Sequence, residues 1–257
     1  MLLKDELSYL KFKENTKGFP KHYHDTFVFS HIIEGTEELK IDGSSIYNEL
    51  GSLLVLNPLE VHSCSENGKN CKLTFESLYI SQDLIDYYFN TKGVYFNQRK
   101  INDSTTYMAF LKLKDALHHN QQYYYNSCLE EFFQALKLNV NFRKSIIQES
   151  QSHAMRESID FINHNIKSRF SVHKLSHIAN INKYSFIRKF KKETGLTPLN
   201  YILMKKVFAT QEDLKFNESL TDIAFQYNFN DIAHYSNTFK KFVGFSPSEF
   251  QKLSITK

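Results

Sequence analysis

Two stretches near the C-terminus share a pattern that decides the fold of the second half of the chain. Residues 190–201 read FKKETGLTPLNY and residues 239–250 read FKKFVGFSPSEF, at an offset of 49. In both, the end of a predicted helix is followed by a glycine, Gly195 or Gly244, which can adopt the left-handed conformation that stops a helix. A hydroxyl residue and a proline come next, and this pair is typical of the start of a new helix.

A weaker match lies upstream of each stretch. The segment LSHIA from Leu175 resembles LTDIA from Leu220, at an offset of 45 residues. This alignment predicts that the second copy has four more residues in the turn between its two helices. Ser171 and Ser219 stand where N-cap residues are expected. In the helix after the turn, aromatic residues spaced four apart predict a buried face: Phe186 and Phe190 in the first copy, Tyr235 and Phe239 in the second.

The pattern of helix, turn, helix, stop and new helix therefore occurs twice, at about 171–195 and 219–244, with a predicted connecting helix over 201–214. A helix-turn-helix places its second helix in the major groove of DNA. Charge supports this interpretation. Residues 1–150 carry 16 basic and 19 acidic side chains (net −3), whereas residues 151–257 carry 16 and 9 (net +7). A compact basic module of this kind is expected to bind a polyanion.

The first half shows a strand-like pattern instead. Short runs of aromatic and β-branched residues fill residues 19–80, and Phe27, Phe29 and the residues after them alternate as in a strand. The dipeptides Asp42-Gly43 and Asn67-Gly68 favour tight hairpin turns. This part is predicted to form a small β-barrel or sandwich.

From about residue 103 to residue 147 the period becomes helical, and two amphipathic helices are predicted. The second carries a long apolar stripe, made of Tyr125, Cys128, Leu129, Phe132, Phe133, Leu136 and Val140. Two interpretations of this stripe stay open: it covers the barrel, or it meets a second subunit. Residues 148–152 are polar and are predicted to be a linker.

Other features narrow the class of protein. No apolar run reaches the roughly 18 residues that cross a bilayer, and the charged start MLLKDE does not resemble a signal peptide. The three cysteines, Cys64, Cys71 and Cys128, are too few for a disulfide scaffold, which favours reduced thiols in the cytoplasm. A cytoplasmic protein without membrane partners is expected.

The repeat resembles a known family. The segments IA at 223–224, YxF at 227–229, YSxxFKK at 235–241 and GFSP at 244–247 are similar to the signature of the AraC/XylS family of bacterial transcription regulators, and the resemblance covers roughly residues 153–252. In the first half, HYH at 22–24, EG at 34–35, Gly51, NP at 57–58 and EVH at 60–62 resemble the cupin-type effector-binding domain of the same family.

The resemblance implies an α+β protein of two domains. Residues 1–147 would form a cupin-like effector-binding and dimerisation domain, with a barrel over about 19–80 and helices over about 103–147. Residues 153–257 would form the DNA-binding domain. The implied function is a regulator, an activator, that binds double-stranded promoter DNA as a homodimer under the control of a small-molecule effector and contacts RNA polymerase. No enzyme activity and no cofactor are assigned.

Site residues follow from the same resemblance. Base contacts are expected from Tyr184, Ile187, Arg188, Ala233, His234 and Asn237. Phosphate contacts are expected from Lys183, Lys191, Lys192, Lys240 and Lys241. The effector pocket is expected to hold His22, His24, Phe27, Phe29 and His62, and the dimer interface Tyr125, Leu129, Phe132, Phe133 and Leu136. Asn228 departs from the family pattern, which has glycine there, but asparagine also tolerates a left-handed turn.

The histidines allow a second hypothesis. His22, His24 and His62 resemble the metal ligands of cupin enzymes, and three imidazoles can bind Zn, Fe or Mn. The carboxylate expected four or five residues after the second histidine is replaced by Val28 and Phe29. A metal site is therefore the less favoured interpretation. Alternatives to an effector-controlled regulator are a metal-dependent cupin enzyme with an accessory DNA-binding module, and a regulator controlled by a protein partner.

Overall fold

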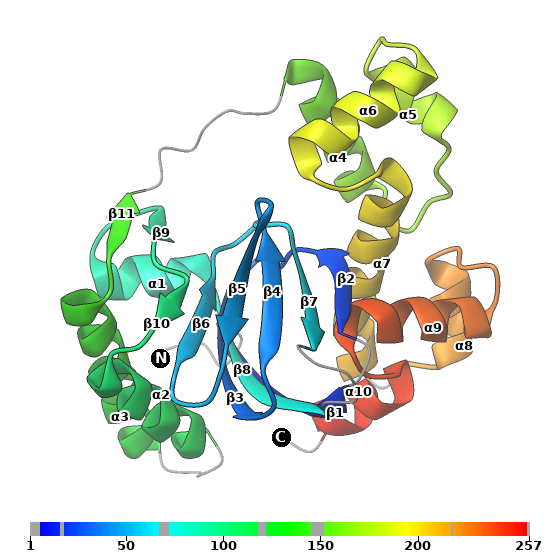
Figure 1. Cartoon of the computed structure of the whole chain (residues 1–257). Helices are drawn as coiled ribbons and strands as arrows, with labels where there is room; N and C mark the ends of the chain where they lie inside the picture. Colours follow the sequence, from blue (N-terminus) through cyan, green and yellow to red (C-terminus); the bar gives the residue numbers. More distant parts are fainter. Residues whose placement is uncertain are drawn as a thin grey trace. The chain divides into compact units, whose positions relative to one another are not determined.

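The computed structural model of the chain describes residues 6–15, 18–66, 72–117, 122–144, 152–216 and 218–255. The chain divides into two compact units (Figure 1). The N-terminal unit is made of Met1–Gly18 and Tyr23–Gln148, and the C-terminal unit of Glu149–Lys257 and the short segment Phe19–His22. That segment is strand β2.

The N-terminal unit is built on two main sheets. The five-stranded sheet has the order β1-β8-β3-β6-β10, and its strands are β1 (Leu7–Asn15), β3 (Phe27–Glu34), β6 (Leu53–Leu56), β8 (Leu73–Ile80) and β10 (Lys100–Ile101). The four-stranded sheet has the order β2-β7-β4-β5, and its strands are β2 (Phe19–His22), β4 (Glu37–Ile41), β5 (Ser44–Asn48) and β7 (His62–Glu66). The short strands β9 (Val94–Phe96) and β11 (Phe142–Lys144) form a separate antiparallel pair.

The turn between β4 and β5 confirms the first predicted hairpin. Asp42 and Gly43 have φ angles of 48° and 79°, and the strands pair from Ile41 with Ser44 outward. Positive φ at both central residues is the geometry that the Asp-Gly dipeptide favours. The second predicted hairpin, at Asn67-Gly68, lies outside the described residues, as does Cys71.

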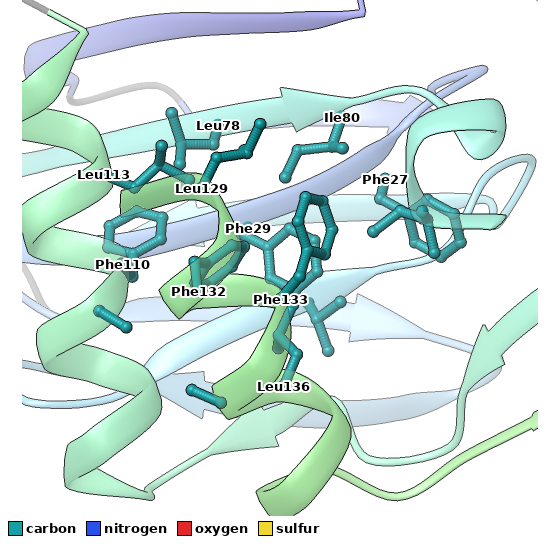
Figure 2. Close-up of a cluster of buried hydrophobic side chains, with 14 of the residues drawn as sticks. Phe27, Phe29, Leu78, Ile80, Phe110, Leu113, Leu129, Phe132, Phe133 and Leu136 are labelled. Carbon is teal, nitrogen blue, oxygen red and sulfur yellow. The ribbon is translucent and has the colours of Figure 1, made fainter. Parts of the chain in front are cut away.

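Three helices cover one face of the five-stranded sheet: α1 (Gln82–Phe89), α2 (Ser104–Ala116) and α3 (Gln122–Asn139). Their apolar side chains meet Phe27, Phe29, Leu78 and Ile80 of the sheet in one large core (Figure 2). The opposite face of the sheet contributes Val28, Leu54 and Leu56 to a smaller core with Leu39 and Ile41 of β4. Strand β3 is therefore buried on both faces.

The apolar stripe of α3 belongs to the large core of the chain itself. Leu129, Phe132, Phe133 and Leu136 are each at most 1% exposed, and Phe132 packs edge-on against Phe29 with ring centroids 5.4 Å apart. Tyr125 packs against the same core. The predicted dimer contact through this stripe is thus wrong. The sequence pattern gave the buried face of the helix correctly, but the partner of that face is the sheet.

In residues 152–216 and 218–255, the part of the C-terminal unit that the structure describes besides β2, the chain forms seven helices. They are α4 (His153–His164), α5 (Val172–Ile178), α6 (Lys183–Thr194), α7 (Pro198–Lys215), α8 (Leu220–Gln226), α9 (Ile232–Val243) and α10 (Pro247–Ile255). Helix α7 connects the pair α5–α6 to the pair α8–α9, as Figure 1 shows. Each second helix anchors the next one through an aromatic contact, since Phe190 packs on Tyr201 and Phe239 on Phe250, with centroids 5.3 and 5.5 Å apart.

The two copies align differently from the prediction in their first helices. Ser171 and Ser219 are the N-cap residues of α5 and α8, and each helix has seven residues. Leu175 therefore corresponds to Ile223, and both are fully buried. The turn after α8 is longer than the turn after α5 by one residue, because α6 begins at Lys183 and α9 at Ile232. Within the described residues, the helices are too short or too polar to cross a membrane.

Candidate DNA-binding surface and ligand site

Both second helices have well-defined ends. The side chain of Asn182 accepts a hydrogen bond of 2.9 Å from the Ser185 N–H, and the side chain of Asp231 accepts one of 2.6 Å from the His234 N–H. Gly195 and Gly244 end the helices with φ angles of 74° and 86°. These caps satisfy backbone groups that would otherwise lack partners, so each helix is held in a fixed length and register.

The predicted base-reading side chains lie on the surface of these helices. In α6, Tyr184 is 77% exposed and Arg188 is exposed, whereas Ile187 is half-buried. In α9, Ala233 and Asn237 are exposed, and His234 is half-buried because its ring packs on Phe229 with centroids 5.6 Å apart. The opposite face of each helix carries a buried aromatic pair: Phe186 and Phe190 in α6, Tyr235 and Phe239 in α9.

The predicted phosphate-binding lysines are all exposed: Lys183, Lys191, Lys192, Lys240 and Lys241. Four of them lie in the last turn of α6 or α9. Cations at that end are stabilised by the negative end of the helix dipole. The lysines therefore add positive charge to both helices without occupying the positions of the base-reading side chains.

Asn228 fills the place where the family pattern has glycine. Its φ angle is 54°, so the left-handed turn is kept. Its side chain donates a hydrogen bond of 2.6 Å to the Lys167 carbonyl oxygen and accepts one of 3.1 Å from Arg169 Nε. A glycine has no side chain for these contacts. The substitution thus ties the turn between α8 and α9 to the segment between α4 and α5.

Lys206 of α7 is a buried cation that the sequence pattern did not single out. It is 5% exposed, and its Nζ donates a hydrogen bond of 2.6 Å to the carbonyl oxygen of Tyr227, the residue that ends α8. Its Nζ also lies over the rings of Phe170 and Phe229. Burial, with a smaller effect of the nearby Arg169 charge, lowers the pKa of Lys206 to about 8. This contact fixes the connecting helix to the second helix-turn-helix.

Three histidines from β2, β7 and the segment after β2 offer a group of ring nitrogens. Among the described residues, His22, His24 and His62 each offer one ring nitrogen, and these nitrogens all lie within 4.8 Å of one another. His22 and His62 are buried, and His24 is half-buried. Burial lowers the pKa of His22 to about 4, so its ring is neutral at physiological pH. The ring of His24 packs against His62 and, edge-on, against Tyr79.

Phe27 and Phe29, predicted to share a pocket with these histidines, lie elsewhere. Both are fully buried in the helix-covered core, where each packs edge-on against Phe96. His24 contacts Tyr79, which packs on the opposite, inter-sheet side with the smaller core. The pocket prediction therefore combined two side chains from the helix-covered face of the five-stranded sheet with histidines from outside that sheet. This happened because His22, His24 and His62 lie outside β3, so the alternation along that strand does not place them.

The two carboxylates nearest to the histidines in sequence differ in their surroundings. Asp25 is exposed. Glu60 accepts hydrogen bonds from the Tyr95 hydroxyl at 2.6 Å and from the Asn57 backbone N–H at 2.9 Å, and it forms an ion pair with Arg99. Glu60 thus holds the loop between β6 and β7 against the segment around β9.

A second buried polar cluster surrounds Glu76 of β8. This carboxylate is paired with Lys11 at 2.8 Å, with His31 at 2.9 Å and with Lys114 at 3.0 Å. Burial alone would raise the pKa of Glu76, but hydrogen bonds, led by the one from Lys11, outweigh it and hold the pKa well below its usual range. The cluster joins β1, β3, β8 and α2 by charge-assisted contacts.

Family models match both units. The model of the AraC-like ligand-binding domain matches residues 7–136, and the model of a helix-turn-helix domain matches residues 175–253. The class of protein is therefore a DNA-binding transcription regulator with a ligand-binding domain. The chain belongs to the AraC family of transcription regulators.

Individual relatives agree with this assignment. The HTH-type transcriptional regulator YbfI of Bacillus subtilis is 24% identical over 237 residues, which are 87% of this chain and 84% of YbfI. The HTH-type transcriptional activator RhaS of Enterobacter is 21% identical, over 91% of this chain and 88% of RhaS. The structure of ToxT from Vibrio cholerae has the same fold, with a TM-score of 0.62 and 14% identity over 99% of this chain and 100% of ToxT.

Proposed function

We propose that this regulator is a sequence-specific activator that acts as a homodimer and contacts RNA polymerase, and that a small effector bound in its N-terminal unit controls it. The observation that carries the proposal is the pair of capped helices, α6 and α9, which present exposed polar side chains over buried aromatic pairs. Such helices fit the major groove, and two of them on one connecting helix suit adjacent groove segments.

Relatives support the remaining parts of the proposal. RhaS and the XylDLEGF operon transcriptional activator 2 of Pseudomonas putida, which is 25% identical over 140 residues, are named as activators. ToxT from Vibrio cholerae has been solved with an unsaturated fatty acid bound. A regulator whose two units resemble these proteins is expected to couple a bound effector to DNA binding, and such coupling requires that the effector favour one state of the protein.

The test uses the full chain. Genome-wide mapping of bound DNA, combined with expression profiling of a deletion strain, is expected to give a short list of promoters whose transcripts fall in the deletion strain. Purified protein should bind these promoters with an affinity that drops steeply as salt rises, because lysine–phosphate contacts release counterions. Bound promoters whose transcripts rise in the deletion strain would show a repressor instead. Folded protein that binds no DNA at any salt concentration would contradict the proposal as a whole.

A further inference from the structure

In the described residues, the two helix-turn-helix pairs are joined by α7 and by a second connection that does not follow the chain. Tyr201 of α7 packs on Phe190 of α6, and α7 also contacts α8 and α9. The second connection joins residues 167–170, which lead directly into α5, to residues 227–229, in the turn between α8 and α9. A single long helix can curve along its length, and a second connection opposes that movement.

Asn228 supplies the hydrogen bonds of the second connection. Its side-chain nitrogen donates a hydrogen bond of 2.6 Å to the Lys167 carbonyl oxygen, and its Oδ1 accepts one of 3.1 Å from Arg169 Nε. The donor and the acceptor of one amide group are therefore both used, which fixes the orientation of the side chain. These two bonds hold the turn between α8 and α9 at a set distance from the start of α5.

Two lysines add contacts at the same place. Nζ of Lys206 on α7 donates a hydrogen bond of 2.6 Å to the Tyr227 carbonyl oxygen. The same Nζ lies 5.6 Å from the ring centroid of Phe170 and 6.0 Å from that of Phe229, and Nζ of Lys167 lies 5.0 Å from the ring centroid of Tyr227. A cation over an aromatic ring is attracted to it. The connecting helix, the segment before α5 and the turn after α8 thus meet at one point.

We infer that Asn228 is a positioning residue for DNA recognition, which fixes the separation of α6 and α9 so that the protein accepts one spacing between the two subsites of its promoter. A subsite is the set of base pairs that one of these helices contacts. The inference rests on the proposed function and deepens it, because it states a property that the bound promoters share. Asn228 acts through the two helices and needs no contact with a base.

One inserted base pair is a large displacement for helices held at one separation. A turn of B-DNA is about 34–36 Å long and contains about 10–10.5 base pairs, so the insertion moves the second subsite by about 3.4 Å along the axis and about 35° around it. Hydrogen bonds to base edges weaken over much smaller displacements. The second helix then no longer contributes, and linkage of two binding modules typically contributes about 100-fold or more to affinity.

Asn180 provides a matched control in the first helix-turn-helix. Its φ angle is 53°, against 54° for Asn228, and the N–H of each residue donates a hydrogen bond of 3.0 Å to the carbonyl oxygen three residues earlier. Asn180 is exposed, and within the part of the chain that the structure describes its side chain has no hydrogen-bond partner. Glycine adopts positive φ readily, so Asn228→Gly and Asn180→Gly should both keep their turns.

The experiment measures a spacing penalty for the full chain. This is the ratio of the affinity for a mapped promoter to the affinity for the same promoter with one base pair inserted between its subsites, which base-by-base substitution first locates. We expect a penalty of about 100-fold or more for the wild type and for Asn180→Gly. For Asn228→Gly the penalty should be about 5- to 30-fold smaller, because two hydrogen bonds, each worth about 1 kcal/mol or a factor of 5, no longer oppose the movement of α9.

A lower stability of the variant does not by itself change this penalty. Both affinities are measured on one protein sample, so the fraction of folded protein cancels in the ratio. Equal penalties in the wild type and Asn228→Gly overturn the inference. An equal decrease in Asn180→Gly also overturns it, since the effect would then come from a glycine in the turn and not from the contacts of the Asn228 side chain.

The same measurements separate this inference from the proposed function. A promoter in which base substitution finds a single subsite overturns the inference, because no spacing is then recognised, and leaves a regulator that binds DNA. Folded protein that binds no promoter DNA contradicts the proposed function, and the inference with it. A failure of the inference alone is recognised by tight, salt-dependent promoter binding that is preserved in all three proteins.

Discussion

The apolar stripe of α3 can be tested for its two predicted roles, which are to cover the sheet of its own chain or to meet a second subunit. The substitution is Phe132→Ala. Phe132 is fully buried, and its ring packs against Phe29 and Phe110 with centroids 5.4 and 6.1 Å away. Removal of a fully buried phenylalanine side chain costs about 3–5 kcal/mol of unfolding free energy, because apolar contact is lost and a cavity remains. Two edge-on aromatic contacts place the expected loss near the middle of that range, at about 4 kcal/mol.

Calorimetry of the full chain measures the effect. In a unit of this size, about 3–4 °C of melting temperature is lost per kcal/mol, so the transition of the N-terminal unit should fall by about 12–16 °C. The transition of the C-terminal unit should stay in place. Tyr123→Ala is the matched control on the same helix, since Tyr123 is 89% exposed, and its effect should stay within about 0.5 kcal/mol.

Sedimentation of the same samples gives the refuting result. If Phe132→Ala left the unfolding of the N-terminal unit unchanged but converted a dimer to a monomer, the stripe would face a second subunit, and the packing argument would fail. Phe133 is 1% exposed in the core of its own chain. The charged substitution Phe133→Glu is therefore expected to unfold the N-terminal unit rather than to yield a folded monomer.

Three further predictions concern the C-terminal unit. Arg188→Ala should cost about 1–3 kcal/mol on the specific promoter and relax its sequence preference, whereas Lys192→Ala should weaken binding to all sequences alike, as competition with random DNA would reveal. Asp231→Ala should lower the unfolding free energy by about 1 kcal/mol in urea denaturation, and Ser219→Ala by less, because within residues 218–255 Ser219 makes no side-chain capping bond. The pKa of Lys206 is lowered to about 8 in the folded chain, so above pH 8 the unfolded chain binds more protons than the folded chain. The unfolding free energy of the wild type should therefore rise from pH 8 to about 9.5 relative to that of Lys206→Met. Equal pH profiles of the unfolding free energy in the two proteins would contradict this.

The helical repeat was predictable because its signals are local. The glycines Gly195 and Gly244 and the serine or threonine before each proline act within one turn of chain, and the structure gives both glycines positive φ. The alignment of the first helices was wrong for a related reason. Leu220 was matched to Leu175 by identity, but the cap at Ser219 makes Leu220 the first residue of α8. The residue at which a helix begins sets the alignment of the two copies, and a matching leucine does not identify that residue.

The N-terminal unit was less predictable because its contacts are distant in sequence. The sequence analysis did not predict strand β1. Its partner is β8, which begins at Leu73, 58 residues after β1 ends at Asn15, so no local pattern indicates the pairing. Phe27 and Phe29 look like pocket residues from sequence, and nothing local indicates that α2 and α3 will cover that face of β3. The periodicity of α3 identified a buried face correctly, yet a period carries no information about what covers it.

The roles of the base-reading and phosphate-binding residues stay predictions. Their exposure agrees with the expected roles, since Tyr184, Arg188 and Asn237 are exposed beside buried aromatic residues. Exposure selects the side chains that can reach a groove, but the base that each contacts depends on the operator. Lys206 and Asn228 were harder to assign, because burial of a lysine and the side-chain bonds of an asparagine depend on tertiary neighbours.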